Sequence, residues 1–185
     1  MPELPRKKVG IIACSGEELP EGTITRLAAL KVLHQMCPED TVTICLPLFL
    51  AGGEGDRNFA RFYPTIALDG CEKQCAFRGT EKYSNRPAAA IVVTYLIAQS
   101  GLEQPHGCRK LDSAGMMVVE LVAQEVASMV GELLKKGGGG IAWGKPRPII
   151  PKWPGRAAIG DISSWETVRT WIFQLRPMHR AMQVY

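Results

Sequence analysis

Six cysteines are the residues of this 185-residue chain best suited to chemistry: Cys14, Cys37, Cys45, Cys71, Cys75 and Cys108. A thiolate sulfur binds thiophilic metals and attacks disulfides or electrophiles. We expect a cytoplasmic protein, because the first residues lack the long apolar segment of a secretory signal. In that reducing compartment, clustered cysteines indicate metal or redox chemistry rather than disulfides.

Three of these cysteines stand at the ends of predicted strands. The strands, each with its cysteine, are 8–14 with Cys14, 41–46 with Cys45, and 65–69 followed by Cys71. The carboxyl ends of parallel strands share one edge of a sheet, so these distant thiols are expected to meet there. Cys75 follows Cys71 by four residues and is expected to face the same side of one helical turn. Four thiolates of this kind match a tetrahedral zinc site with metal–sulfur distances of ~2.3 Å.

Helical patterns alternate with the predicted strands. Apolar spacing predicts helices over 23–36, where Thr23 or Thr25 can act as the cap, around 56–63, and over 113–135. The segment 88–97 is expected to form a fourth strand, although its alanines also allow a helix. This order predicts an α/β fold, a Rossmann-like three-layer sandwich with a mostly parallel sheet of about four to five strands.

The last part of the chain has a different composition. Gly137–Gly140 form a predicted hinge between a domain over 1–136 and an extension over 137–185 that holds all four tryptophans and many prolines. We expect this Trp/Pro-rich extension to pack on its own domain or on a second subunit, which would form a homodimer. The net charge of +4 arises in the extension. No groove-reading motif accompanies that charge and no apolar run reaches ~18 residues, so we expect neither nucleic-acid binding nor a membrane span.

Three short segments resemble a known family. They are Leu68-Asp69-Gly70-Cys71-Glu-Lys-Gln-Cys75, Ala13-Cys14-Ser15-Gly16 and Ile44-Cys45-Leu46-Pro47. Together they are similar to the DGC-domain family, named for its Asp-Gly-Cys tripeptide, over roughly residues 8–135. The resemblance implies zinc binding through Cys14, Cys45, Cys71 and Cys75, and it supplies no activity.

The residues beside these cysteines have expected roles of their own. Asp69 is expected to orient the following loop by accepting backbone N–H groups, or to act as an outer carboxylate or fifth ligand. Gly70 is expected to allow the chain reversal, at positive φ. Ser15 and Gly16 would open a turn rich in N–H groups, which caps the first helix or holds an anion.

Other functions stay open at this stage. Cys71, the candidate catalytic residue, could attack and Cys75 resolve in a thiol oxidoreductase or redox sensor. Four thiolates also suit an iron–sulfur cluster or a metal-delivery protein, and the extension could serve an adaptor. His106 and Cys108 could add a ligand at the same edge, although a surface loop is the expected alternative. Cys37, His34 and His179 have no predicted role.

Overall fold

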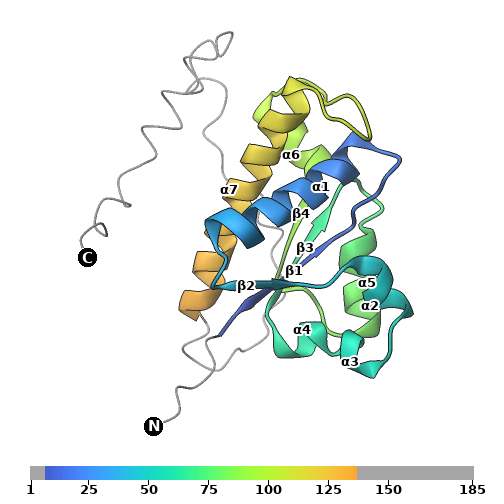
Figure 1. Ribbon diagram of the computed structural model, residues 1–185, viewed down its shortest axis with the longest axis vertical. Helices are drawn as coiled ribbons and strands as arrows, with labels where there is room; N and C mark the ends of the chain where they lie inside the picture. The colour runs from blue at the N-terminus through green and yellow to red at the C-terminus, as the bar shows by residue number, and fades with distance from the viewer. Residues whose placement is uncertain (1–6, 137–185) are drawn as a thin grey trace, which may run out of the picture. The chain divides into compact units, whose positions relative to one another are not determined.

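The computed structural model describes residues 7–136, which form a sheet with helices on both faces (Figure 1). The four strands are all parallel, in the order β2-β1-β3-β4. Their bounds are β1 Val9–Ala13, β2 Thr41–Thr43, β3 Thr65–Asp69 and β4 Ala89–Val92. The predicted α/β class, three layers and parallel sheet are thus confirmed. The extension over 137–185 and its predicted packing lie outside the described residues.

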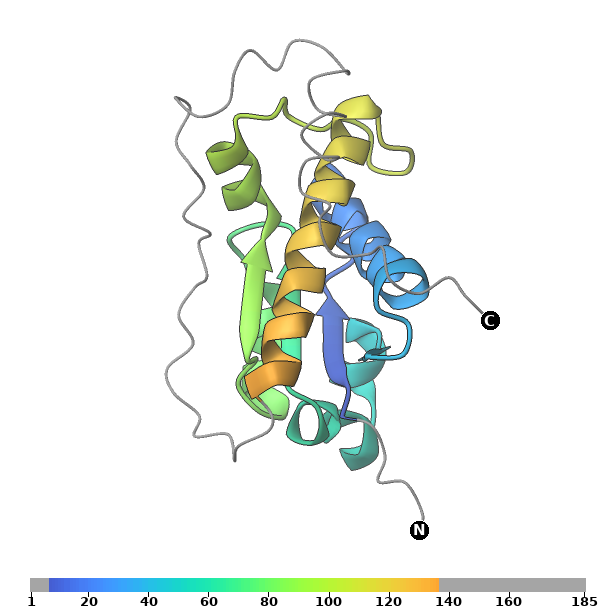
Figure 2. The same ribbon diagram turned by 90° about the vertical axis from the view of Figure 1, so that its left-hand side faces the viewer.

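The helices divide between the two faces of the sheet (Figures 1 and 2). Their bounds are α1 Pro20–Lys31 with its π-helical continuation η1 Val32–Met36, α2 Leu46–Ala51, α3 Glu54–Arg57, α4 Phe59–Phe62, α5 Cys75–Tyr83, α6 Val93–Ser100 and α7 Ser113–Lys136. Helices α1, α6 and α7 cover one face, and α2 and α5 pack on the other. Across residues 7–136, no helix combines the length and the apolar character needed to cross a bilayer.

The two central strands carry the core. Every residue of β1 and β3 is buried, as expected for parallel strands covered on both faces. Ile11 and Leu68 point toward α1 and α7, whereas Ile12 and Ala67 point toward α2 and α5. Because side chains alternate along a strand, both helical layers are fixed to the same pair of strands.

Helix α7 confirms the predicted helix over 113–135. Its buried residues recur at helical spacing, among them Val118, Val122 and Val126. Asp112 caps its first turn by accepting the Gly115 N–H at 2.8 Å through Oδ1. This agrees with the preference of aspartate for the position before a helix.

Several predicted boundaries were wrong. The apolar segment 88–97 is not one strand, because β4 ends at Val92 and α6 begins at Val93. β-branched residues favour strands in general, but Val93 and Ile97, one helical turn apart, both bury their side chains in the core. The second strand ends at Thr43, and the expected helix around 56–63 is the separate pair α3 and α4.

Helix α1 begins before the predicted helix over 23–36. Pro20 is its first residue, where the missing N–H and fixed φ of proline are tolerated. Neither Thr23 nor Thr25 caps the helix, because both lie inside it and are buried. Their hydroxyls bond elsewhere, and those bonds bear on the site described below.

Glu125 on α7 should make stability depend on pH. Burial raises the pKa of this carboxyl above its ordinary value, so the folded state disfavours its ionised form. The domain therefore gains stability as the pH falls through the raised pKa. We expect Glu125→Gln to stabilise the domain at pH 7, by less than ~1 kcal/mol because the group is only half-buried. The gain should vanish in unfolding measurements near pH 4.

Glu120, also on α7, provides a matched control for this prediction. Its carboxylate forms an ion pair with Lys31 of α1. We therefore expect Glu120→Gln to lower stability slightly at pH 7 rather than raise it. A destabilised Glu125→Gln variant would contradict the assignment of Glu125 as an unfavourably buried charge.

Candidate functional site

The strand order places the predicted cysteines at one edge of the sheet. Strand β1 lies between β2 and β3. Cys14 follows β1, Cys45 follows β2 and Cys71 follows β3, so Cys14 comes from the middle strand of the three. The connection after β1 leads to β2 on one side of β1, whereas the next strand, β3, pairs with the other side of β1. The order of the strands therefore reverses its direction at β1. Ligands in open parallel sheets bind at such a switch point, outside the carboxyl ends of the strands.

Cys14 is fixed to the end of β3 by two hydrogen bonds. Its N–H donates to the Leu68 carbonyl at 2.8 Å, which extends the pairing of β1 with β3. Its Sγ accepts the N–H of Gly70 at 3.3 Å. The half-buried sulfur of Cys14 therefore faces the Asp69-Gly70-Cys71 tripeptide directly.

Cys71 and Cys75 are joined by a tight turn. The Gln74 N–H donates to the Cys71 carbonyl at 3.1 Å, and Gln74 adopts a left-handed conformation with φ 52°. Helix α5 then begins at Cys75. The prediction that both cysteines lie on one helical turn was therefore wrong, because the turn closes before the helix starts.

Asp69 caps α5 from the end of β3. Its carboxylate is buried and accepts the N–H groups of Ala76 at 2.7 Å and Phe77 at 3.0 Å. Burial raises the pKa of Asp69, while these two hydrogen bonds and the nearby charge of Arg78 lower it. The expected role in orienting the loop by backbone hydrogen bonds is confirmed, and it fixes the helix that begins at Cys75.

The surroundings of the Cys75 thiol raise its pKa. Partial desolvation raises its pKa most, and the negative charges of Asp69, Cys14 and Cys71 raise it further, against a smaller opposite effect of Lys73. Two other thiols and a carboxylate therefore lie within electrostatic reach of Cys75. Without a cation, such mutual repulsion favours the neutral thiol.

Cys45 lies at the same edge but stands apart from these three cysteines. It is exposed, two residues beyond β2, and precedes the first residue of α2. Close packing brings α2 against α5, since a Cβ added at Gly79 would lie 3.0 Å from Leu50 and 3.6 Å from Leu46. Cys45 and Cys75 thus begin two helices that pack side by side.

These thiols do not form a ready-made metal site. Within residues 7–136, no three His, Cys, Asp or Glu side chains are grouped closely enough to hold an ion as they stand. The donors suit zinc in chemical type and follow strands that end at one edge, but binding would require their side chains to come closer together. The four-cysteine metal site stays a prediction.

Glycine is required beside Cys14 for close approach rather than for a special backbone angle. Gly70 does not adopt the expected positive φ. A Cβ at this position would lie 2.9 Å from the Gly22 nitrogen and 3.0 Å from the Glu21 carbonyl carbon. Gly70 therefore lets the start of α1 pack directly on the end of β3.

The Ser15–Gly16 turn does not cap the first helix, contrary to one of its expected roles. Helix α1 starts only at Pro20, and the Ser15 N–H instead donates to the Thr25 hydroxyl at 3.2 Å. Ser15 adopts a left-handed conformation with φ 51°. This contact depends on the fold around the site and has no signal in the local sequence.

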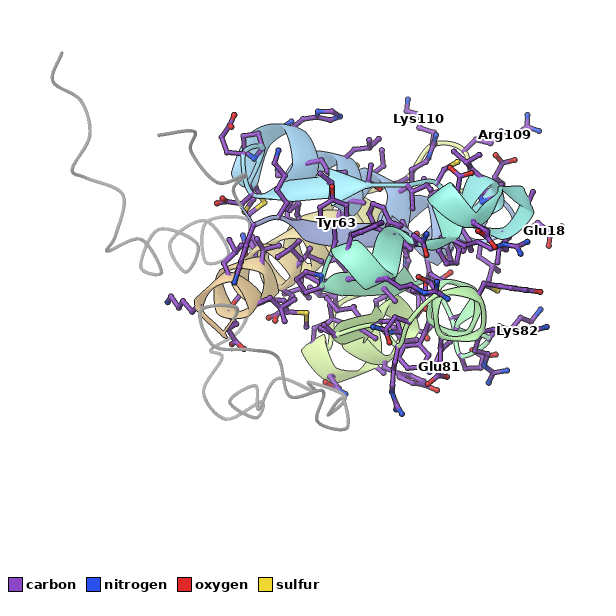
Figure 3. All side chains as sticks on the ribbon, turned by 90° about the horizontal axis from the view of Figure 1, so that it is seen from below. Glu18, Tyr63, Glu81, Lys82, Arg109 and Lys110 are labelled. Atoms are coloured by element: carbon purple, nitrogen blue, oxygen red, sulfur yellow. The ribbon has the colours of Figure 1, made fainter. Side chains whose placement is uncertain are left out.

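The loop between α6 and α7 reaches the same edge. The Cys108 thiol donates to the Glu18 carbonyl at 3.2 Å, and the Thr23 hydroxyl bonds to the Cys108 carbonyl. Figure 3 shows Glu18 and Arg109 at the same end of the domain. The expectation that this loop could reach the edge is thus confirmed for Cys108, whereas its role as a ligand stays untested.

The remaining cysteine and histidines show no contact with this group among the hydrogen bonds of the described residues. Cys37 ends η1 just before β2 and so stands at the opposite, amino edge of the sheet. His34 is exposed on η1. His106 is also exposed, and its backbone is bonded to Asp112: its N–H donates to the carboxylate at 3.2 Å, and its carbonyl accepts the Asp112 N–H at 3.2 Å. His179 lies outside the described residues.

Comparison with known proteins gives one match. A family model described as DGC domain matches residues 10–111, which include all four strands and the cysteines at their ends. No curated protein and no solved structure matches the chain.

Proposed function

The chain belongs to the DGC domain family, and we propose that it is a zinc-binding protein whose ligands are Cys14, Cys45, Cys71 and Cys75. The observation that carries this proposal is the strand order β2-β1-β3, which gathers residues far apart in sequence at one edge. Cysteine thiolates are the preferred ligands of structural zinc. The free thiols of all six cysteines suit a reducing compartment such as the cytoplasm.

The electrostatics of the site support a cation. The negative charges of Asp69, Cys14 and Cys71 all raise the pKa of Cys75. A divalent ion would reverse that effect by stabilising the thiolates, so metal binding would release protons. Without an ion, the raised pKa favours the neutral thiol of Cys75.

The four ligands should contribute unequally. Cys14 is fixed by its N–H bond to Leu68 and by the Gly70 N–H, whereas Cys45 is exposed, and the charges that raise the pKa of Cys75 are those of Asp69, Cys14 and Cys71. Cys14 therefore provides the fixed point, and Cys45 closes the site last. A site in which Cys45 leaves would offer an open coordination position for a ligand.

Metal analysis of the protein purified under anaerobic conditions tests this proposal. We expect about one zinc per chain, and loss of affinity by more than ~100-fold in Cys14→Ser, Cys71→Ser and Cys75→Ser, because removing a ligand costs more than removing an outer-shell partner. Cys45→Ser should weaken binding less. Affinities would be measured by competition with a chromophoric chelator.

Cys37→Ser is the matched control, because Cys37 lies at the amino edge of the sheet. It should bind zinc as the parent does. Equal affinity in the Cys14→Ser and Cys37→Ser variants would refute the proposal. Absorbance of bound iron would indicate an iron–sulfur protein instead, and a metal-free protein with a reversible Cys71–Cys75 disulfide would indicate a thiol oxidoreductase.

A further inference from the structure

Thr25 has a buried hydroxyl group to which the proposed zinc site assigns no role. It lies inside α1 and is 0 % exposed, so its hydroxyl has no access to water. A polar group in such a place is retained only when its hydrogen bonds are satisfied. All of its polar contacts lie on the chain between Cys14 and Gly22.

The Thr25 hydroxyl links the start of α1 to Cys14. Its oxygen accepts the Ser15 N–H at 3.2 Å and donates its hydrogen to the Gly22 carbonyl at 2.7 Å. The Cys14 Sγ lies 3.7 Å from the same oxygen. One side chain therefore touches both the sulfur and the backbone on its carboxyl side.

The backbone next to Cys14 needs such a contact. Ser15 adopts φ 51°, a left-handed conformation that is unfavourable for a residue with a Cβ. Surrounding contacts must hold such a residue in place. The hydrogen bond from the Ser15 N–H to Thr25 supplies one, and the Gly70 N–H approaches the sulfur at 3.3 Å.

We propose that Thr25 is a positioning residue that holds the Cys14 sulfur in place for metal binding. This inference rests on the proposed function, because it assigns a task to a residue that is not a ligand. Outer-shell groups of this kind orient ligands and tune metal affinity. The nearby Thr23, also buried on α1, has its hydroxyl bonded to the Cys108 carbonyl instead.

Three variants of the full chain separate positioning from folding. Thr25→Val removes the hydroxyl while keeping the shape, Thr25→Ser keeps the hydroxyl, and Thr23→Val removes a different buried hydroxyl on the same helix. We expect Thr25→Val to weaken zinc binding by about 10- to 100-fold and to change the absorption spectrum of the cobalt-substituted protein. Thr25→Ser and Thr23→Val should retain the parent affinity and spectrum. Thr25→Ala replaces Thr25→Val if the valine variant does not fold.

A second measurement needs no metal and keeps this inference separate from the proposed function. Alkylation of the metal-free protein at a single pH, with each cysteine followed by peptide mass mapping, reports the environment of the Cys14 thiol. We expect faster alkylation of Cys14 in Thr25→Val and an unchanged rate in Thr25→Ser and Thr23→Val. A parent chain that binds no zinc would refute the proposed function alone. An unchanged Cys14 rate in Thr25→Val, or equal changes in Thr23→Val, would overturn the role of Thr25.

Discussion

Gly22→Ala is expected to lower the free energy of unfolding by about 3 kcal/mol or more. A variant that does not fold at all would agree with this expectation. A Cβ at Gly22 would overlap the carbonyl oxygen of Gly16, and that atom belongs to the backbone. The clash cannot be relieved by rotating a side chain. The start of α1 would have to move away from the loop after Cys14 and from Gly70, which also packs on Gly22.

Gly131→Ala provides the control for this prediction. Gly131 lies on α7, and a Cβ built there would meet no described atom within 4 Å. Alanine is the better helix former, so this variant should gain about 0.5–1 kcal/mol. Chemical denaturation of both variants measures the difference, and a Gly22→Ala domain as stable as the parent would show that α1 does not pack as described.

Asp69→Ala is expected to destabilise the domain by about 2–4 kcal/mol, because one buried and one partly buried N–H donor lose their acceptor together. The donors are Ala76 and Phe77 in the first turn of α5. Because Cys75 begins this helix, the same variant should also weaken metal binding at the proposed zinc site. Denaturation of the metal-free chain and metal competition measure the two effects separately.

Two comparison variants define what Asp69 contributes. Asp69→Asn keeps one carbonyl oxygen and loses the charge, so it should retain part of the capping and fall between the parent and Asp69→Ala. Asp112→Ala removes the capping aspartate of α7, which is partly exposed and accepts the Gly115 N–H, and should cost less than Asp69→Ala. If Asp69→Ala and Asp112→Ala were equally mild, Asp69 would not be the buried support of α5.

Much of the sheet could be predicted from the sequence because its central strands are short apolar runs. The strand predicted over 65–69 is correct to the residue, and the strand over 8–14 differs from Val9–Ala13 only at its ends. By contrast, the segment that forms α6 was assigned to a strand, although its alanines left a helix possible. Its β-branched residues favour a strand locally, whereas the packing of Val93 and Ile97 against the core requires a helix.

The candidate site could be predicted only in part for a similar reason. Cysteines at strand ends could be placed at one edge because parallel topology alone requires it. The contact of Thr25 with Cys14 and that of Cys108 with Glu18 join segments 11 and 90 residues apart. Such contacts depend on how loops and helices pack against the sheet, and no local sequence pattern predicts them.

The hydrogen bond from the Cys14 N–H to Leu68 makes this cysteine part of the sheet. Central strands separate only when a whole domain unfolds, whereas surface turns open by local fluctuation. Oxidants or competing ions that enter during such brief openings would therefore encounter Cys45, Cys71 and Cys75 first. The Cys14 sulfur would be the last of the four to become accessible. Oxidative damage at this edge of the sheet would therefore begin at the other three cysteines and leave Cys14 intact.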